Sequence, residues 1–359
     1  MKKIAVLGCG KVFAKHLKSI NILEKKRKLK LVAICDKNKR LIESIKIKNV
    51  NKYIDVEEML RREKIDIISI LTPSGFHYKH AIQFAGKVKY VILEKPITLK
   101  ISDAKKLIQI FKRKKTKIFV VLQNRFNESI VELKKAIDNN LFGDIFLITV
   151  RLRWSRDINY YSQAKWRGTW ELDGGVVANQ SAHFIDLIQW LFGMPTNVFS
   201  RIKQMQKIKK KVEDTALSIF EYKNKKKLAL LEATNAIRPK NLEGSLSVIG
   251  KNGSVVIGGI HADKLISWTL KKSNQVKRLL KLDYKNSKNG HTKFYTYVIN
   301  NINKKKKNFF SGEEALKSLI LINSIYCSSQ KKSSLKILDT KDTFLGVKKN
   351  FKNKINLWK

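Results

Sequence analysis

A lysine that follows a predicted strand is the first side chain that could do chemistry. Lys95 stands after the apolar run 90–93, within the sequence Glu94-Lys95-Pro96. Pro96 disfavours helical backbone angles at Lys95, so the lysine should project from an extended segment at the sheet edge where ligands of open α/β folds bind. Next to a cationic group the pKa of such an amine falls, and the amine can bind or deprotonate a hydroxyl. The alternative is a solvated surface lysine, one of many in this chain.

A histidine in a predicted helix is the second candidate. Asn179, His183 and Asp186 stand at i, i+4 and i+7 and should share one face of a helix over 176–192. A histidine in that place can take a hydroxyl proton near neutral pH while a neighbouring polar group orients its ring. The alternative is a buried histidine that its helix neighbours satisfy. The chain has 6 His, no HExxH sequence and no cluster of Cys and His, so we expect no metal.

A glycine-rich loop indicates a phosphate site. The sequence Gly8-Cys9-Gly10-Lys11-Val12-Phe13 follows a predicted strand over 3–7 and opens a helix. Glycines let the backbone approach a pyrophosphate, and a helix N-terminus supplies positive potential. Phe13 stands where the dinucleotide-binding fingerprint has its third glycine, so a tight strand-to-helix turn is the alternative.

An aspartate at the end of the second predicted strand supports the dinucleotide interpretation. Asp36 follows the loop at a spacing suited to the adenosine ribose. Its carboxylate would accept hydrogen bonds from the ribose hydroxyls and repel a 2′-phosphate, which favours NAD over NADP. Lys37, Lys39 and Arg40 follow closely and weaken that preference.

The order of the predicted elements indicates an α/β fold with two domains. Over residues 1–122, short β-branched runs alternate with helical patterns, which is typical of a Rossmann-type parallel sheet with helices on both faces. After Gln123 comes a loop-rich stretch, 153–173, and later a run of strands with no helix between them. We therefore expect an α+β domain with a large, open, mainly antiparallel sheet over residues 123–335, followed by a loosely held basic tail, 336–359.

The composition excludes several classes of protein. Of the 359 residues, 43% are hydrophobic, which is enough for packed cores. No apolar run approaches the ~18–20 residues of a membrane span. Three cysteines without a CxxC pair are too few for a disulfide framework and favour a reducing compartment. The apolar stretch at the start is too short for a secretion signal, so we expect a cytoplasmic protein.

The charge of the chain is strongly positive. Lys+Arg number 75 against 29 Asp+Glu, a net charge of +46. Clustered basic residues are typical of nucleic-acid binding, but here the lysines are spread along the chain and no nucleic-acid-binding motif accompanies them. We expect salt-dependent, non-specific attraction to polyanions, but no specific nucleic acid and no membrane as partner.

Several motifs together resemble one family of oxidoreductases, the glucose-fructose oxidoreductase / inositol dehydrogenase / rhizopine catabolism (Gfo/Idh/MocA) family. The resemblance covers residues 1–335 in order and spacing. It rests on the glycine loop, Thr72-Pro73-Ser74 with His77, the block from Ala85-Gly86-Lys87 to Glu94-Lys95-Pro96, Asp173-Gly174-Gly175 and His183-Phe184-Ile185-Asp186. Further stretches are similar to the subgroup that oxidises UDP-N-acetylglucosaminuronic acid at C3, namely residues 123–127, 150–161, 166–170, and 232–234 with 238–240.

The resemblance implies an NAD-dependent dehydrogenase. Lys95 and His183 would contact the C3 hydroxyl of the sugar, and one of them would take its proton. We favour His183 as the base and Lys95 as the group that binds the oxygen, although the roles could be exchanged. Many family members carry Asp four residues before this histidine, whereas this chain has Asn179, which cannot act as a base. The implied cofactor-binding residues are Gly8, Gly10, Lys11, Val12, Asp36, Arg40, Leu71, Thr72, Pro73, Ser74, His77, Glu94, Lys95, Gln123, Trp166 and Arg167.

The implied substrate carries a diphosphate and a carboxylate, which need cationic and donor groups. Besides Lys95 and His183, the candidate substrate-binding residues are Arg156, Tyr160, Lys165, Arg167, Asn179 and Arg238. Arginine and tryptophan along this loop could instead fill a subunit interface. The two alternative functions are another sugar or cyclitol dehydrogenase of the same fold, acting on an uncharged polyol, and a non-catalytic ligand-binding regulator.

The resemblance also implies partners. A homo-oligomer, a dimer of dimers, would form through the open face of the antiparallel sheet. The 3-keto sugar would pass to a PLP-dependent aminotransferase on the way to a surface polysaccharide such as O-antigen. In some members of the subgroup, 2-oxoglutarate re-oxidises the bound NADH.

Overall fold

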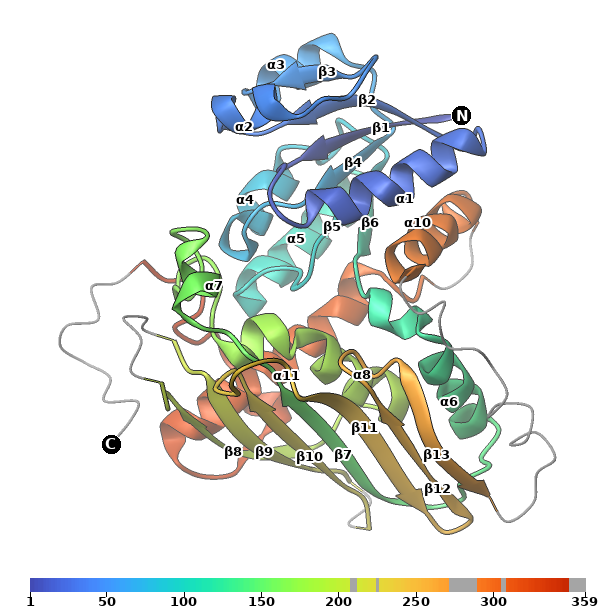
Figure 1. Ribbon diagram of the computed structural model, residues 1–359, viewed down its shortest axis with the longest axis vertical. Coiled ribbons are helices and arrows are strands. Elements are labelled where there is room, and N and C mark those ends of the chain that lie inside the picture. Colours follow the sequence, from blue (N-terminus) through green and yellow to red (C-terminus); the bar gives the residue numbers. More distant parts are fainter. Residues whose placement is uncertain (207–211, 224–225, 271–288, 305–307, 349–359) are drawn as a thin grey trace. The chain divides into compact units, whose positions relative to one another are not determined.

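The structure, a computed structural model, describes residues 1–206, 212–223, 226–270, 289–304 and 308–348 (Figure 1). The chain divides into two compact units. Unit 1 comprises residues 1–123 and 289–316, and unit 2 comprises residues 124–288 and 317–359. Residues 289–316, which the sequence analysis assigns to the second domain, therefore belong to unit 1. There helix α10 (Gly290–Asn301) packs against helix α1 (Phe13–Lys25) and buries Phe294 and Val298 completely.

Unit 1 is built on a six-stranded parallel sheet in the order β3-β2-β1-β4-β5-β6. Its strands are β1 (Lys2–Leu7), β2 (Leu29–Cys35), β3 (Asn51–Tyr53), β4 (Ile67–Ile70), β5 (Tyr90–Leu93) and β6 (Lys117–Val120). The strands β4 and β5 are buried at every position, as expected for a parallel sheet covered on both faces. The strand order reverses beside β1, and ligands of such sheets bind at the carboxyl ends of the strands near that point.

Helices cover both faces of this sheet. The other helices of unit 1 are α2 (Lys39–Ser44), α3 (Val56–Arg62), α4 (His77–Ile82) and α5 (Ile101–Arg113). Right-handed crossovers that leave β1 and β4 in opposite directions place α1 and α4 on opposite faces. In agreement, α1 packs with α10, and α4 packs with α5. The predicted Rossmann-type parallel sheet is confirmed.

Unit 2 contains an eight-stranded sheet in the order β13-β12-β11-β7-β10-β9-β8-β14. Its strands are β7 (Ile145–Arg153), β8 (Asn197–Lys203), β9 (Thr215–Glu221), β10 (Leu228–Thr234), β11 (Glu243–Gly250), β12 (Gly253–Gly258), β13 (Lys264–Leu270) and β14 (Leu335–Lys336). The strands β7 and β10 run parallel, whereas the other neighbouring pairs are antiparallel. The expected mainly antiparallel sheet is confirmed, and β7 at its centre is a strand that the sequence analysis did not predict.

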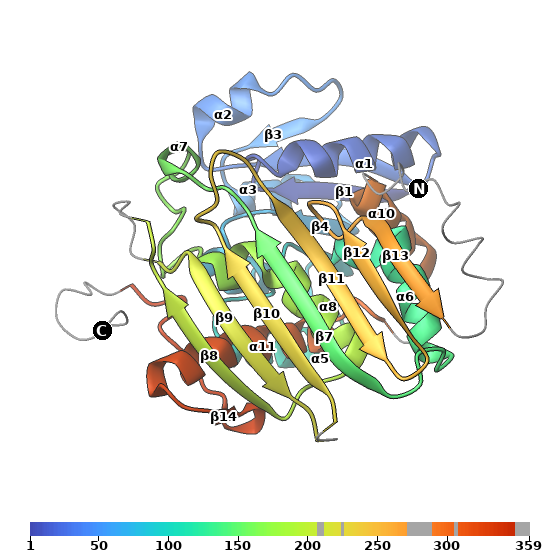
Figure 2. The same cartoon turned by 60° about the horizontal axis from the view of Figure 1, so that its bottom comes forward.

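The sheet of unit 2 has one covered and one open face. Along β9, Ala216, Ser218 and Phe220 are buried, whereas Leu217 and Ile219 are 52% and 45% exposed. Figure 2 looks onto the open face, with α6 (Glu128–Asp138), α8 (Ala182–Phe192) and α11 (Gly312–Lys331) behind the strands. Such alternation is typical of a sheet that packs on a core through one face only.

Three segments of unit 2 differ from the prediction. The expected helix 176–192 is broken, because Val176–Gln180 forms a π-helical turn and α8 begins only at Ala182. The loop-rich stretch contains a short helix, α7 (Ile158–Ser162). The tail is held as far as residue 348, since Leu345 is fully buried and Gly346 N–H donates to the carbonyl of Trp170. Residues 349–359 of the predicted tail lie outside the described part. In the described ranges, no helix is both long and apolar enough to cross a membrane.

Candidate active site

The glycine loop of unit 1 is shaped by close backbone contacts. Gly8 has φ of +96°, and a Cβ there would lie 2.9 Å from backbone atoms of Leu71 and Thr72, so only glycine fits. A Cβ on Gly10 would meet nothing within 4 Å, which leaves open space beside the loop. Helix α1 begins at Phe13 without a side-chain cap. Open space beside Gly10 and the positive potential of a helix start fit a pyrophosphate.

Asp36 is held beside this loop by backbone donors. Its Oδ2 accepts the N–H of Cys9 at 2.8 Å, and its Oδ1 accepts the N–H of Asn38 at 2.9 Å. The carboxylate is thus fixed at the carboxyl end of β2, where its remaining lone pairs can accept ribose hydroxyls. Arg40 is exposed near the start of α2.

A buried histidine links the end of β4 to the segment that contains Lys95. The ring of His77 is fully buried, with Nδ1 2.7 Å from the carbonyl oxygen of Pro96 and Nε2 2.9 Å from that of Thr72. Burial lowers the pKa of His77 and favours the neutral ring, which donates to one carbonyl at a time. The predicted cofactor segment 71–74 is therefore joined to Lys95-Pro96, whose peptide bond is cis.

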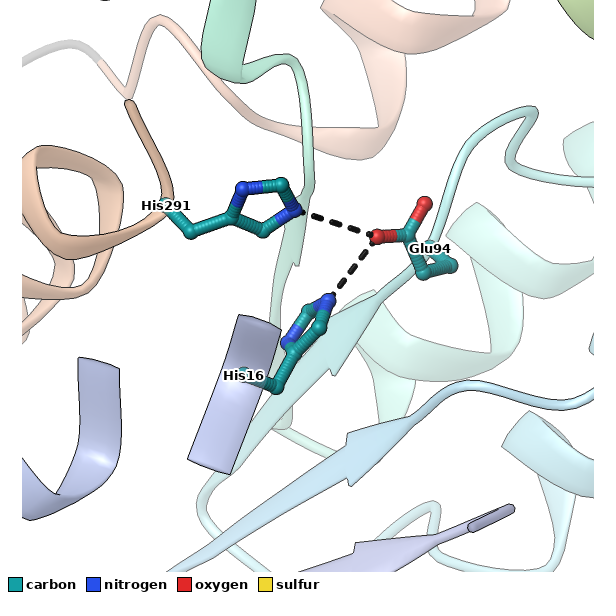
Figure 3. A group of neighbouring side chains, drawn as sticks. All are labelled: His16, Glu94 and His291. Atoms are coloured by element: carbon teal, nitrogen blue, oxygen red, sulfur yellow. Dashed lines mark hydrogen bonds and ion pairs between the residues drawn. The ribbon is translucent and has the colours of Figure 1, made fainter. Parts of the chain in front are cut away.

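Glu94 is the centre of a buried polar cluster (Figure 3). Its Oε1 lies 2.9 Å from Nε2 of His16 and 3.9 Å from Nε2 of His291, and its Oε2 accepts the N–H of Lys95 at 3.0 Å. Burial raises the pKa of Glu94, but the interactions with His16 and His291 together outweigh burial and hold the pKa well below its usual value. Tyr295 Oη lies 2.8 Å from Nδ1 of His16. Sequence reasoning missed this cluster because His16 and Tyr295 stand 279 positions apart.

Two arginines of unit 2 enclose a tyrosine. The guanidinium carbon of Arg156 lies 5.0 Å from the ring centroid of Tyr160, and that of Arg167 lies 4.5 Å from it. Arg167 Nη1 also donates to the tyrosine hydroxyl at 2.6 Å. The rings of Trp154 and Trp166 lie 4.9 and 4.8 Å from Arg156 and Arg167 respectively. Stacking on aromatic rings holds both guanidinium groups in place.

These arginines gather without an acidic partner. Arg238 joins them, donating from Nη2 to the carbonyl of Arg156 at 3.4 Å. In the described part of the chain, Arg156, Arg167 and Arg238 form no ion pair with a carboxylate, and the buried Nε atoms of Arg156 and Arg167 reach no acceptor. Guanidinium groups that lie together without a carboxylate partner fit an anionic ligand such as a carboxylate or a diphosphate. Lys165 is exposed on the same loop.

Asp173 ties the segment before α8 to the loop that carries Arg167. Its Oδ1 accepts from Nδ2 of Asn179 at 2.6 Å, and its Oδ2 accepts the N–H of Gly168 at 2.7 Å. His183 is half-buried in the first turn of α8. Because the helix is interrupted between Asn179 and His183, the predicted α-helical spacing of these two residues is wrong.

Asp186 has a different partner from the one the helical spacing suggests. It forms a two-pronged ion pair with Arg125, at 2.7 and 2.6 Å, and both side chains are almost completely buried. Ser318 donates to the same carboxylate at 2.7 Å. This pair anchors α8 in the core of unit 2 and leaves His183 on a fixed helix.

A buried glutamate that sequence reasoning missed supports the π-helical turn. Glu213 is fully buried, and its Oε1 accepts from the hydroxyl of Tyr326 at 2.7 Å and from the N–H of Val177 at 3.0 Å. Burial raises the pKa of Glu213 to about 8. Its Oε2 packs against Gly175, where a Cβ would come within 2.2 Å. No sequence motif marks this residue.

The structure groups the predicted residues within each unit. In unit 1 it joins the glycine loop to Asp36, and Thr72 through His77 to the segment 94–96, while Gln123 begins a 3₁₀ turn at the end of the unit. In unit 2 it brings together Arg156, Tyr160, Arg167 and Arg238. Lys95 belongs to unit 1 and His183 to unit 2. Their shared role stays a prediction.

Known proteins are similar to both parts of the chain. The family described as "Oxidoreductase family, NAD-binding Rossmann fold" matches residues 2–122, and "Oxidoreductase family, C-terminal alpha/beta domain" matches residues 134–337. Glucose-6-phosphate 3-dehydrogenase of Bacillus subtilis is 25% identical over 288 residues, 74% of this chain and 77% of that protein. Two other curated oxidoreductases match over only 61% and 47% of their own length.

Solved structures of two enzymes resemble this fold over almost the whole chain. The WlbA dehydrogenase of Bordetella pertussis, solved with NADH and UDP-GlcNAcA, has a TM-score of 0.86 and 29% identity, covering 94% of this chain and 99% of that one. The WlbA dehydrogenase of Chromobacterium violaceum, solved with the same two ligands, has a TM-score of 0.87 and 28% identity, covering 93% and 95%. The two family models cover most of the chain and show that it belongs to the Gfo/Idh/MocA oxidoreductase family, with NAD as the cofactor of the Rossmann domain over residues 2–122.

Proposed function

We propose that this protein oxidises the C3 hydroxyl of UDP-N-acetylglucosaminuronic acid to the 3-keto sugar with NAD⁺. The observation that carries the proposal is the group of Arg156, Arg167 and Arg238, which have no carboxylate partner in the described residues. An uncharged polyol would leave such a group without a counter-charge, whereas a nucleotide sugar with a carboxylate supplies several. The resemblance to two dehydrogenases solved with UDP-GlcNAcA supports the same substrate class.

The residues of unit 1 suit the cofactor. The open space beside Gly10 and the uncapped start of α1 receive the pyrophosphate, and Asp36 accepts the ribose hydroxyls. NAD⁺, when bound, supplies the hydride acceptor. Lys95 presents its amine from a segment that Glu94 and His77 hold.

The chemical step needs one base and one group that binds oxygen. In this proposal His183 takes the proton of the C3 hydroxyl and Lys95 binds the oxygen, while hydride leaves C3 for the cofactor. The products are the 3-keto sugar, NADH and one proton. Asn179 is held by Asp173 and binds substrate rather than acting as a base.

The proposal includes a homo-oligomer that forms through the open face of the unit 2 sheet. The outward apolar side chains lie on neighbouring strands and are 39–52% exposed: Leu147, Phe199, Leu217, Ile219, Leu228 and Ile249. Beside them Arg153 pairs with Glu232 at 2.5 Å and with Glu243 at 3.3 Å. A second copy would bury this apolar face, which would otherwise favour non-specific association. The 3-keto product would then be consumed by an enzyme that converts ketones to amines.

The test follows absorbance of NADH in purified protein supplied with NAD⁺ and UDP-N-acetylglucosaminuronic acid, with myo-inositol as the uncharged control. We expect signal with the nucleotide sugar only. The variants His183→Ala and Lys95→Ala should each lose at least about a hundredfold in turnover, because a positioned acid or base contributes about 10²–10⁴-fold. Both variants should still bind NADH. Faster turnover on addition of 2-oxoglutarate would identify the acceptor that recycles the cofactor.

Oxidation of myo-inositol instead would contradict the argument from the arginines. NAD binding without turnover of either compound would indicate a ligand-binding protein.

A further inference from the structure

The two residues that flank Lys95 in sequence are each held by a buried histidine. His16 lies 2.9 Å from the carboxylate of Glu94, and His77 lies 2.7 Å from the carbonyl oxygen of Pro96. Both histidines are fully buried, and they come from different elements, α1 and α4. The short segment that carries the Lys95 amine is therefore fixed from both ends.

The contact on the Glu94 side is one link in a chain of hydrogen bonds. Tyr295 Oη lies 2.8 Å from His16 Nδ1 and 2.9 Å from Ser69 Oγ. When the tyrosine hydroxyl donates to Nδ1, the neutral ring of His16 carries its proton on Nε2 and donates it to Glu94. The second oxygen of Glu94 accepts the N–H of Lys95 at 3.0 Å. One arrangement of protons thus satisfies every group from Ser69 to Lys95.

The same cluster has the composition of a metal site. One ligand atom each of His16, Glu94 and His291 lie within 4.8 Å of one another (Figure 3). A metal would require the proton of His16 to move from Nε2 to Nδ1, and Tyr295 would then have to accept a hydrogen bond instead of donating one. His291 lies 3.9 Å from Glu94, beyond hydrogen-bond distance. The hydrogen-bonded chain accounts for His16, Glu94, Tyr295 and Ser69 together, so it is the interpretation that the geometry favours.

We propose that His16 and His77 are positioning residues for Lys95: they fix Glu94 and Pro96, and through them the backbone from which the Lys95 amine reaches its target. The role of Lys95 in hydride transfer rests on the proposed function. The fixing of the segment 94–96 does not depend on it.

The first measurement compares kcat and KM in four variants, His16→Leu, His16→Gln, His77→Leu and His77→Gln. The leucine variants remove every hydrogen bond of the ring, whereas glutamine keeps one amide donor. We expect kcat to fall at least tenfold in the leucine variants, and this factor should exceed the factor by which the KM for NAD⁺ rises. In the glutamine variants, kcat should be about threefold or more higher than in the corresponding leucine variants. Tyr53→Phe is the matched control: Tyr53 lies on β3, at the far edge of the sheet, and the variant removes a part-buried hydroxyl that donates to Glu63. Its kcat should stay within twofold of wild type.

The second measurement needs no substrate. Trace labelling of lysine amines, resolved by peptide mass spectrometry, gives the reactivity of Lys95 in the whole protein with NAD⁺ present. We expect the leucine variants to change the labelling rate of Lys95 at least threefold and that of Lys52 or Lys87 by less than about 1.5-fold. If wild-type protein does not oxidise the nucleotide sugar, the proposed function fails, yet the labelling of Lys95 still decides whether the histidines position it.

Two results would overturn the inference. The first is a loss of thermal stability in the variants while kcat and the labelling rate of Lys95 stay at their wild-type values. This would show that the histidines have only a structural role. One equivalent of tightly bound transition metal in the purified protein, lost in His291→Ala, would make the cluster a metal centre. If His16→Leu fails to fold, Tyr295→Phe takes its place, since it removes only the hydroxyl that bonds to Nδ1 of His16. Wild-type values of kcat and of the Lys95 labelling rate in Tyr295→Phe would overturn the proposal for His16.

Discussion

The candidate cofactor-binding residues of unit 1 and the clustered arginines of unit 2 are held in different ways. In unit 1, Asp36, His77 and Glu94 all bind backbone N–H or carbonyl groups at the carboxyl ends of parallel strands. In unit 2, Arg156 and Arg167 stack on aromatic rings and have no acidic partner among the described residues. In unit 1 the side chains of the candidate site are therefore fixed by backbone groups, which suits a cofactor that is always the same. Unit 2 presents charged side chains on an irregular segment, where substitutions can change the substrate without disturbing the sheet.

The largest difference in stability should come from the buried ion pair of unit 2. Arg125→Met leaves the carboxylate of Asp186 buried without its cation, and we expect a loss of about 3–5 kcal/mol in the free energy of unfolding. Arg62→Met in unit 1 is the control, because its pair with Glu58 is exposed and such pairs contribute less than about 1 kcal/mol. Chemical denaturation measures both. Equal losses would show that burial of the ion pair does not set its contribution.

Glu213 should make the stability of unit 2 depend on pH. Burial raises its pKa to about 8 from the ordinary 4.5, so the folded state binds the proton more tightly than the unfolded chain. This contribution is fully present below pH 4.5 and is lost as pH rises through 8. Glu213→Gln stays neutral and should be more stable than wild type at pH 9, by on the order of 5 kcal/mol, and equal to it near pH 4. Thermal denaturation across this range measures the effect. Exposed Glu221→Gln is the control, and parallel curves for Glu213→Gln and wild type would contradict the prediction.

Arg156 should act on the substrate alone. Arg156→Ala removes a guanidinium that stacks on Tyr160, and we expect the KM for the nucleotide sugar to rise about 10- to 100-fold, as for loss of a hydrogen bond to a charged group. The KM for NAD⁺ and kcat should change less than twofold. Arg156→Lys should recover only part, because lysine lacks the planar fork. Steady-state kinetics with each substrate varied in turn measures the two KM values separately. A rise in the KM for NAD⁺ instead would assign Arg156 to the cofactor.

Asp36 should give the smallest effect, on the choice of cofactor. Asp36→Asn keeps an acceptor for the N–H of Cys9 or Asn38 and removes the charge that repels a 2′-phosphate. We expect the ratio of kcat/KM for NAD⁺ to that for NADP⁺ to fall about tenfold, equivalent to about 1.4 kcal/mol. A ratio that does not move would assign the discrimination to the neighbouring basic residues.

Features that depend on local pattern could be read from the sequence. In unit 1 the alternation of short apolar runs with helical patterns predicted a parallel sheet, and its strands β4 and β5 are buried at every position. Gly8 predicted a tight loop, and its φ is positive in the structure. Strand β7 was not predicted, although its buried Ile148, Val150 and Leu152 alternate with the less buried Thr149 and Arg151, as on the other strands of this sheet. Its place between β10 and β11 depends on residues that follow much later in the chain.

The break before α8 shows why other features could not be predicted. The N–H of Val177 donates to Glu213 and that of Ala178 to Tyr326, partners 36 and 148 positions away. Both N–H groups lie in the first turn, where a helix offers no partner of its own, and these distant acceptors satisfy them. The N–H of Ser181 donates to the carbonyl of Val176, five positions back, and this π-helical bond changes the spacing of Asn179 and His183.

The sequence by itself determined the fold class, the cofactor loop and the identity of the candidate residues, because periodicity, glycine and strand ends act over a few positions. Only the tertiary structure decided which polar groups meet. His16 with Glu94, Arg125 with Asp186 and Val177 with Glu213 are pairs of residues distant in sequence. The physical reason is that a buried polar group must be paired, while the segment that supplies its partner is chosen by the packing of the whole unit.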